Sequence, residues 1–254
     1  MVHSKGAIMK FGIADYGLNM WDGDAFDNEH RWHELKEIGY EGVERIIAAN
    51  ADELIQKSAR MRKCGFDFGT VRAPSVELSI QWTAAVGKDY VWTEVNGKDF
   101  DTFCRQVNTQ TKACARWGIR VALHNHLGSL VETQSELLAF LDACPGCRLV
   151  LDTAHLAAAE GGDPLSIVAR FPERLEVIHL KDWIESDSSA SVWNKRGRFC
   201  ELGAGNIGLD NAAVMRKLVE VGYDGWIFVE HDTHLQNPLI DLAKSRDYLR
   251  DAGF

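Results

Sequence analysis

The amino-acid sequence predicts an α/β protein built as a single (β/α)8 barrel, the TIM-barrel class. Short apolar segments alternate with helical ones, one pair for roughly every 30 residues, and the 254 residues have the usual length of one such barrel. Helical segments end at a glycine before the next strand, as at Gly39, Gly65 and Gly222. A doubly wound sheet is the competing architecture, but residues 12–17 do not form the glycine-rich phosphate loop typical of it.

The order of the elements follows from these patterns. Asp163 is expected to cap a helix that has Pro164 at its first position. The long polar segment 185–198 is expected to be a loop that forms a lid or a subunit contact. Strands are expected at 10–16, 42–46, 66–71, 90–95, 120–126, 148–152, 175–180 and 226–230. Helices are expected at 29–38, 51–63, 99–117, 134–143, 163–171, 211–221 and 238–250.

Composition excludes several classes of protein. The net charge of −9 argues against a nucleic-acid partner, which would require a basic patch. No apolar run approaches the ~20 residues that cross a bilayer, and no signal peptide is visible. The cysteines, including Cys144 and Cys147 in a CPGC sequence, are expected to be reduced thiols of a cytoplasmic protein. We expect one domain over residues 9–254, with residues 1–8 as an N-terminal extension or a cloning remnant.

Acidic and imidazole side chains stand at or just after the ends of four predicted strands. They are Glu132, Asp152, His179 and Glu230. The carboxyl ends of parallel barrel strands share one face, so these side chains can converge on one ion. Three carboxylates and an imidazole suit Mn²⁺, Mg²⁺, Co²⁺ or Zn²⁺. The sequence therefore predicts one divalent metal ion as cofactor.

Each of these residues also has a structural interpretation. Asp152 could cap the following helix. His179 could be a core histidine with a satisfied hydrogen bond. Glu230 could pair with a nearby Lys or Arg, because a buried carboxylate needs a partner. Glu132 could be a solvated loop residue or part of the first turn of the next helix.

Four motifs resemble the sugar isomerase/epimerase superfamily with a xylose-isomerase-like barrel, which includes tagatose-type epimerases, hydroxypyruvate isomerase and inosose dehydratase. They are LDTAHL at 151–156, VIHLKD at 177–182, ELGAG at 201–205 and GYDGWIFVE at 222–230. The resemblance covers nearly the whole chain from Met9 and implies metal ligands at Asp152, His179 and Glu230.

The first ligand departs from the epimerase pattern. Epimerases carry a Glu in the fifth strand, where this chain has LHNHLG at 123–128. With VET at 131–133, this segment looks more like the inosose dehydratase branch, in which Glu132 would reach back from the loop. His124 or His126 could take its place.

Further side chains are expected around the ion. His124 and His126 point the same way from their strand, and Lys181 shares the side of His179. His155 resembles the substrate-binding His of the family. We expect Glu132, Glu230, His124 and Lys181 to be catalytic and His126, His155, Glu44 and Trp183 to bind substrate. The alternatives are core or helix-facing positions for His124 and His126, a surface position for Lys181, and an ion pair with a local Arg for Glu44. The aromatic residues expected in loops after strands could stack on a sugar, or could instead pack within the loops or at an oligomer contact; they are Tyr16, Trp21, Trp82, Trp183 and Trp193.

These features predict an enzyme that removes a proton α to the carbonyl of a keto-sugar or keto-cyclitol. Subsequent β-elimination would make it a carbon–oxygen lyase, either a dehydratase or a 3-keto-glycoside lyase. Return of the proton would make it an isomerase or epimerase. The remaining alternatives are a noncatalytic sugar-binding barrel and a metal-dependent DNA-repair endonuclease, which the acidic charge disfavours. A small-molecule sugar or cyclitol is the expected partner, with no nucleic acid or membrane, and a homo-oligomer stays open as an alternative to a monomer.

Overall fold

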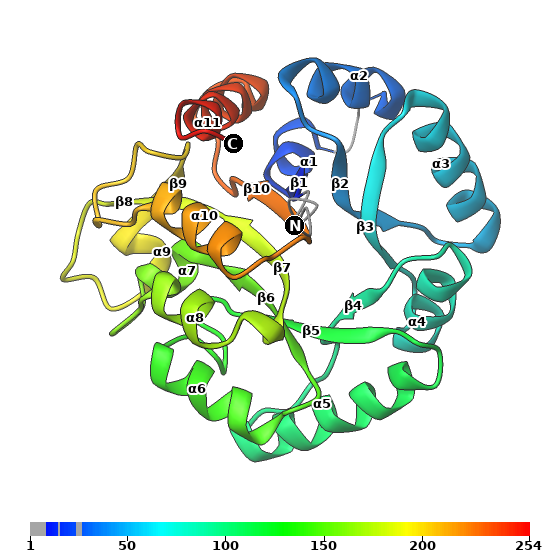
Figure 1. The fold of residues 1–254 in the computed structure, drawn as a ribbon, viewed down its shortest axis with the longest axis horizontal. Helices are drawn as coiled ribbons and strands as arrows, with labels where there is room; N and C mark the ends of the chain where they lie inside the picture. The colour runs from blue at the N-terminus through cyan, green and yellow to red at the C-terminus, as the bar shows by residue number, and fades with distance from the viewer. Residues whose placement is uncertain (1–8, 15, 24–26) are drawn as a thin grey trace, which may run out of the picture.

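The computed structural model describes residues 9–14, 16–23 and 27–254. Within them, eight parallel strands form one sheet that curves into a nearly closed barrel, and the helices surround it (Figure 1). The predicted fold class is therefore confirmed. The strands are β1 Lys10–Ala14, β2 Gly42–Ile47, β3 Asp67–Arg72, β4 Tyr90–Trp92, β5 Arg120–His124, β6 Arg148–Asp152, β7 Leu175–Leu180 and β10 Trp226–Glu230.

Most of the described helices begin at a polar residue whose side chain caps them. Asp163 accepts a hydrogen bond from the backbone of Ser166, and Pro164 follows it, as predicted. Thr133 and Glu136 form a reciprocal capping box. The helices are α1 Tyr16–Asp22, α2 Asn28–Ile38, α3 Ala51–Cys64, α4 Val76–Ala85, α5 Phe100–Ala115, α6 Gln134–Ala143, α7 Thr153–Ala157, α8 Pro164–Arg170, the 3-10 turn η1 Pro172–Arg174, α10 Asn211–Glu220 and α11 Pro238–Asp251.

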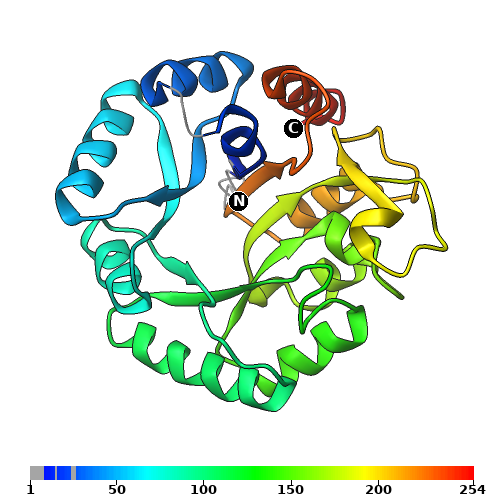
Figure 2. The same ribbon diagram turned by 180° about the vertical axis from the view of Figure 1, so that it is seen from behind.

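Some elements differ from the expectation. The segment 185–198 is not a simple loop, because it lies largely within a hairpin of β8 Asp182–Glu185 and β9 Gly197–Cys200 that also carries α9 Trp193–Arg196. This hairpin lies at the rim of the barrel in both views (Figure 2). The fourth and fifth strands end earlier than predicted, at Trp92 and His124. Residues 1–8 lie outside the described residues, as does position 15 of the first predicted strand.

Besides α9, three α-helices of the described residues were not expected: α1, α4 and α7. The α4 sequence is apolar and rich in β-branched residues, which hides its helical period, although Ser75 caps it by accepting from Leu78. The expectation that the five aromatic residues lie in loops was wrong. Tyr16 and Trp21 lie in α1, Trp82 in α4, Trp183 in β8 and Trp193 in α9.

The core has two layers. A small cluster fills the barrel interior, and a larger one packs between sheet and helices. The sheet order runs β3-β2-β1-β10-β7-β6-β5-β4, so β3 and β4 are its two ends. Across that seam, the Thr70 hydroxyl donates to the Tyr90 carbonyl at 2.5 Å. The interior cluster comprises Ala14, Tyr90, Ala122, Val150, Val177 and Phe228.

All six cysteines are free and buried. Cys144 and Cys147 each donate to backbone carbonyls, and burial raises the pKa of the Cys144 thiol to about 12. The CPGC sequence therefore holds packed thiols, as expected. Across the described residues, no helix is both long and apolar enough to cross a membrane.

Candidate active site

Side chains from the carboxyl ends of four strands meet in one cluster. Its four donor atoms all lie within 4.8 Å of one another. Asp152 and His179 are register partners across β6 and β7, and Glu230 ends the neighbouring strand β10. Parallel strands place such side chains in one layer at one face of the barrel. We call this group the central cluster: His124, Asp152, His179 and Glu230.

His179 lies between carboxylates. Its Nδ1 is 2.6 Å from Glu230 Oε2 and 3.9 Å from Asp152 Oδ2. Its Nε2 is 3.1 Å from Glu44 Oε2, but the angles are not those of a hydrogen bond, and neither atom has a hydrogen-bonding partner among the described residues. Burial acts to lower the pKa of His179, but Glu44 and Glu230 outweigh it and raise the pKa to about 10. The surrounding carboxylates therefore favour the protonated ring.

Lys181 contacts the same carboxylates. Its Nζ lies 3.3 Å from Asp152 Oδ2, 3.0 Å from Glu230 Oε2 and 2.9 Å from Asp232 Oδ2, and its side chain is 1% exposed. Burial lowers the pKa of Lys181, but these carboxylates raise it more, so the ammonium stays charged. The ion pair considered for Glu230 is present, and the surface position considered for Lys181 is wrong.

Asp152 uses both carboxylate oxygens. Oδ1 accepts from the backbone N–H of His155 at 2.8 Å and caps α7. Oδ2 lies 3.3 Å from His124 Nε2. Asn125 fixes the backbone here, because its amide donates to the Asp152 carbonyl and accepts from the Asp152 N–H. The helix-cap interpretation is therefore correct, and the cap uses only Oδ1, so that Oδ2 faces His124 and Lys181 in the central cluster.

The central cluster fits a divalent metal ion in its chemistry. It offers two carboxylates and two imidazoles, a set that suits Mn²⁺ or Zn²⁺. Burial lowers the pKa of His124, which favours the neutral ring with a lone pair to donate. Burial and Glu230 also raise the pKa of Asp232 to about 7.

The balance of charges in the site also favours a bound metal cation. Four buried or nearly buried carboxylates face two cations, which leaves up to two negative charges uncompensated, and such buried charge is costly. The carboxylates are those of Glu44, Asp152, Glu230 and Asp232, and the cations are His179 and Lys181.

Glu132 lies outside the central cluster. Its carboxylate accepts a hydrogen bond from the Gly128 N–H at 2.8 Å, within the loop between β5 and α6. His124 stands in the cluster instead, which was the alternative for the first ligand. The loop turns back on itself after Gly128, whose φ of 78° only glycine adopts readily, and this turn was not visible in the sequence.

An aromatic wall stands beside the cluster. The His126 and His155 rings are 3.8 Å apart, and Trp193 of the hairpin packs edge-on against both. His124 and His126 are neighbours at 5.6 Å between ring centroids, as their spacing predicted. The hairpin thus covers the histidines on this side of the site.

Glu44 and Trp183, two predicted substrate-binding residues, are both buried. Glu44 is fully buried, and its Oε1 accepts from the Tyr90 hydroxyl at 3.1 Å and from the Trp92 indole N–H at 2.8 Å. Arg45 is farther away, with Nε 4.0 Å from Glu44 Oε2. Trp183, a residue of β8 in the hairpin, is 1% exposed and packs in an apolar cluster with Phe199 of β9. Substrate contact by these two residues stays a prediction.

Two residues of the site were missed in the sequence. Asp232 contacts Lys181, and the two-residue spacing from Glu230 that predicted Lys181 would also have found it. Asn125 acts through the backbone of Asp152, and no pattern in the sequence reveals such a partner.

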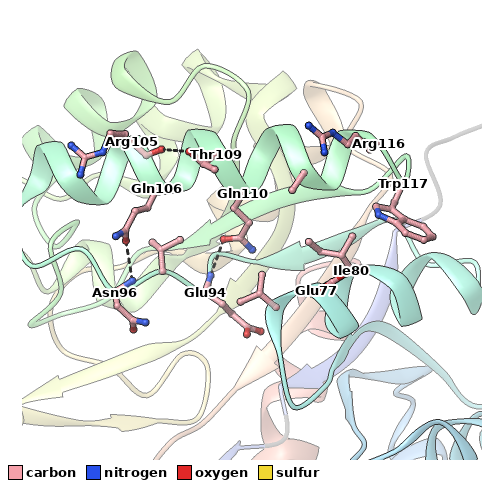
Figure 3. Close-up of a pocket in the computed structure, with 13 residues that line it drawn as sticks. Glu77, Ile80, Glu94, Asn96, Arg105, Gln106, Thr109, Gln110, Arg116 and Trp117 are labelled. Carbon is pink, nitrogen blue, oxygen red and sulfur yellow. Dashed lines mark hydrogen bonds between the residues drawn. The ribbon is translucent and has the colours of Figure 1, made fainter.

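A separate pocket of 710 Å³ lies on the outside of the barrel between α4 and α5 (Figure 3). Gln110 donates to the Trp92 carbonyl and accepts from the Glu94 N–H at its floor. Ile80 and Trp117 line its apolar side. None of the residues that line this pocket belongs to the central cluster.

Known proteins resemble this chain in sequence and in fold. Inosose dehydratase of Klebsiella pneumoniae subsp. pneumoniae is 32% identical over 159 residues, which cover 58% of this chain and 52% of that protein, so the chain spans about half the length of the curated relatives it matches. The probable 3-DHS dehydratase of Bacillus anthracis has a TM-score of 0.75 at 15% identity and covers 95% of this chain and 99% of its own. The 3-keto-D-glucoside 4-epimerase of E. coli has a TM-score of 0.71 at 16% identity and covers 96% and 99%.

A family model also matches this chain. The model described as xylose isomerase-like TIM barrel matches residues 72–252, which is most of the chain. The solved structures share the fold at low identity. The sequence relatives include inosose dehydratase, the protein that the 123–133 segment was expected to resemble. The chain belongs to the xylose isomerase-like TIM barrel family.

Proposed function

We propose that this protein is a divalent-metal-dependent lyase that removes a proton α to the carbonyl of a keto-sugar or keto-cyclitol and then eliminates a β-oxygen substituent. One observation carries the proposal: Glu230 Oε2, a candidate base, lies 3.0 Å from the Lys181 ammonium inside a buried donor cluster. A base beside a fixed cation suits a reaction in which negative charge develops on a carbonyl oxygen. The inosose dehydratase relatives support the same chemistry.

The metal ion would be held by His124, Asp152, His179 and Glu230, where it would supply Lewis-acid polarisation of the carbonyl. Glu230 takes the α-proton, and the C–H electron pair moves onto the carbonyl oxygen. Lys181 stabilises that oxygen as it gains charge. The electron pair then returns to re-form the carbonyl and a carbon–carbon double bond forms as the β C–O bond breaks. The departing oxygen takes a proton from His126, and the products are an unsaturated ketone and water or an alcohol.

Isomerisation or epimerisation is the second candidate, because it shares the first half of this sequence, and the solved neighbours include epimerases. We favour elimination because His124 stands in the fifth strand where the epimerases carry a carboxylate. An imidazole there leaves one fewer acid–base carboxylate to return the proton to the opposite face.

The metal-loaded protein should be assayed with inososes and 3-keto-glycosides in D₂O. We expect deuterium exchange at the α-carbon together with a new ultraviolet band of an unsaturated ketone. The His126→Ala variant should keep the exchange and lose the band by about 100-fold, because His126 acts after the proton is removed. His33→Ala, an exposed residue of α2, is the matched control. A mass-conserving isomer as the sole product would instead establish the second candidate, and the absence of α-exchange with every substrate would refute both.

A further inference from the structure

Outside the central cluster, three donor side chains meet behind the end of β10. His231 follows Glu230 directly, and His234 and Asp241 come from the next loop and the first turns of α11. Strand alternation turns His231 away from the barrel interior, so this group is separate from the central cluster although it adjoins it in sequence. We call it the α11 cluster: His231, His234 and Asp241.

The three donor atoms of the α11 cluster are close enough to share one ion. His231 Nδ1 and His234 Nδ1 are 2.9 Å apart, His234 Nδ1 and Asp241 Oδ2 are 2.9 Å apart, and His231 Nδ1 and Asp241 Oδ2 are 3.6 Å apart. A triangle with these sides has a circumradius of about 1.9 Å, just under the Zn–N bond of about 2.0–2.1 Å. An ion at bond length from all three atoms would therefore lie slightly off their plane.

Hydrogen bonds alone explain the short contacts of the α11 cluster less well than a shared metal ion does. A ring nitrogen has one in-plane position, which holds either a proton or a lone pair. His234 Nδ1 has two short contacts, to a nitrogen and to an oxygen, and a single proton on it cannot point along both. A cation between the three atoms satisfies every contact at once.

The surroundings prepare the cluster for an ion. The side chains of His231, His234 and Asp241 are only 2–4% exposed, so water does not separate the donors. Gln236 donates to the other Asp241 oxygen at 2.6 Å, which orients the carboxylate with Oδ2 toward the histidines. Such support of a ligand by a neighbour is typical of metal sites.

We propose that the α11 cluster binds a second divalent ion of the zinc class, which ties the end of β10 to the start of α11. Two imidazoles and a carboxylate suit zinc, with a fourth position open. The role of this ion is structural, because it would fix the backbone next to Glu230 without facing the barrel interior.

Bound zinc should be counted by elemental analysis after dialysis of the full-length protein, both with the native central cluster and with Asp152→Asn. In each background, His234→Ala or Asp241→Asn should lower the number of bound zinc ions by one per chain, or weaken zinc binding at the α11 cluster by at least about 100-fold. Either variant should also remove part of the zinc-dependent rise in Tm. His33→Ala on α2 should change neither.

The Asp241→Asn variant keeps the shape of the side chain, and circular dichroism checks that each variant folds. Equal zinc in wild type and in both folded variants would overturn the second site. That outcome leaves the central cluster untouched, because its ion is followed through the Asp152 background.

Discussion

Replacement of Asp152 by asparagine should weaken metal binding by at least about 100-fold and lower turnover about a thousandfold. The amide can still cap α7 through its oxygen, since Asn is as good a cap as Asp. What it loses is the negative charge of Oδ2, which faces His124 and Lys181. The expected effect is therefore on the ion and on the chemistry, with little change in the fold.

Bound metal, kcat and thermal stability should be measured together for Asp152→Asn. Asp163→Asn is the matched control, because Asp163 caps α8 in the same way but lies outside the central cluster. Full metal occupancy with normal turnover in the Asp152 variant would rule out the central cluster as the metal site.

Replacement of Lys181 by methionine should lower the free energy of unfolding by about 3–5 kcal/mol. It should also lower turnover by a factor of about 10²–10³. The variant removes the cation that contacts Asp152, Glu230 and Asp232 and leaves their charges buried together. Removal of a second charge should relieve part of this cost. The double variant Lys181→Met with Asp232→Asn should therefore be more stable than Lys181→Met alone, yet equally inactive.

Denaturant unfolding and kcat test this expectation. Lys217→Met is the control, because Lys217 pairs with the exposed Glu220, and an exposed pair contributes at most about 1 kcal/mol. Equal stability of the Lys181 and Lys217 variants, with normal turnover in both, would mean that Lys181 is dispensable.

The periodic parts of this molecule were readable in the sequence. The strands that carry Asp152, His179 and Glu230 are apolar runs with a polar residue at or near the end, and the parallel barrel then requires these side chains to meet. The position of Lys181 followed from the same two-residue alternation.

The parts that escaped prediction depend on contacts between distant segments. Glu132 lies outside the central cluster and accepts a hydrogen bond from the Gly128 N–H, which depends on the turn of its own loop. The hairpin that carries Trp193 forms because the polar segment after β7 pairs with itself, and its sequence shows little alternation. A local pattern cannot reveal either arrangement.

The seam between β3 and β4 is the place where the ring of strands is not closed by a backbone ladder. Between the two end strands of the sheet order, the Thr70 hydroxyl of β3 donates to the Tyr90 carbonyl of β4, and β4 has only three residues. The Tyr90 hydroxyl reaches past β3 and donates to Glu44 of β2. A ring with one weak joint yields there first, since a few side-chain bonds open at lower cost than a backbone ladder. Glu44 also contacts His179 of the central cluster. A small widening at the seam would therefore change the distance between Glu44 and His179.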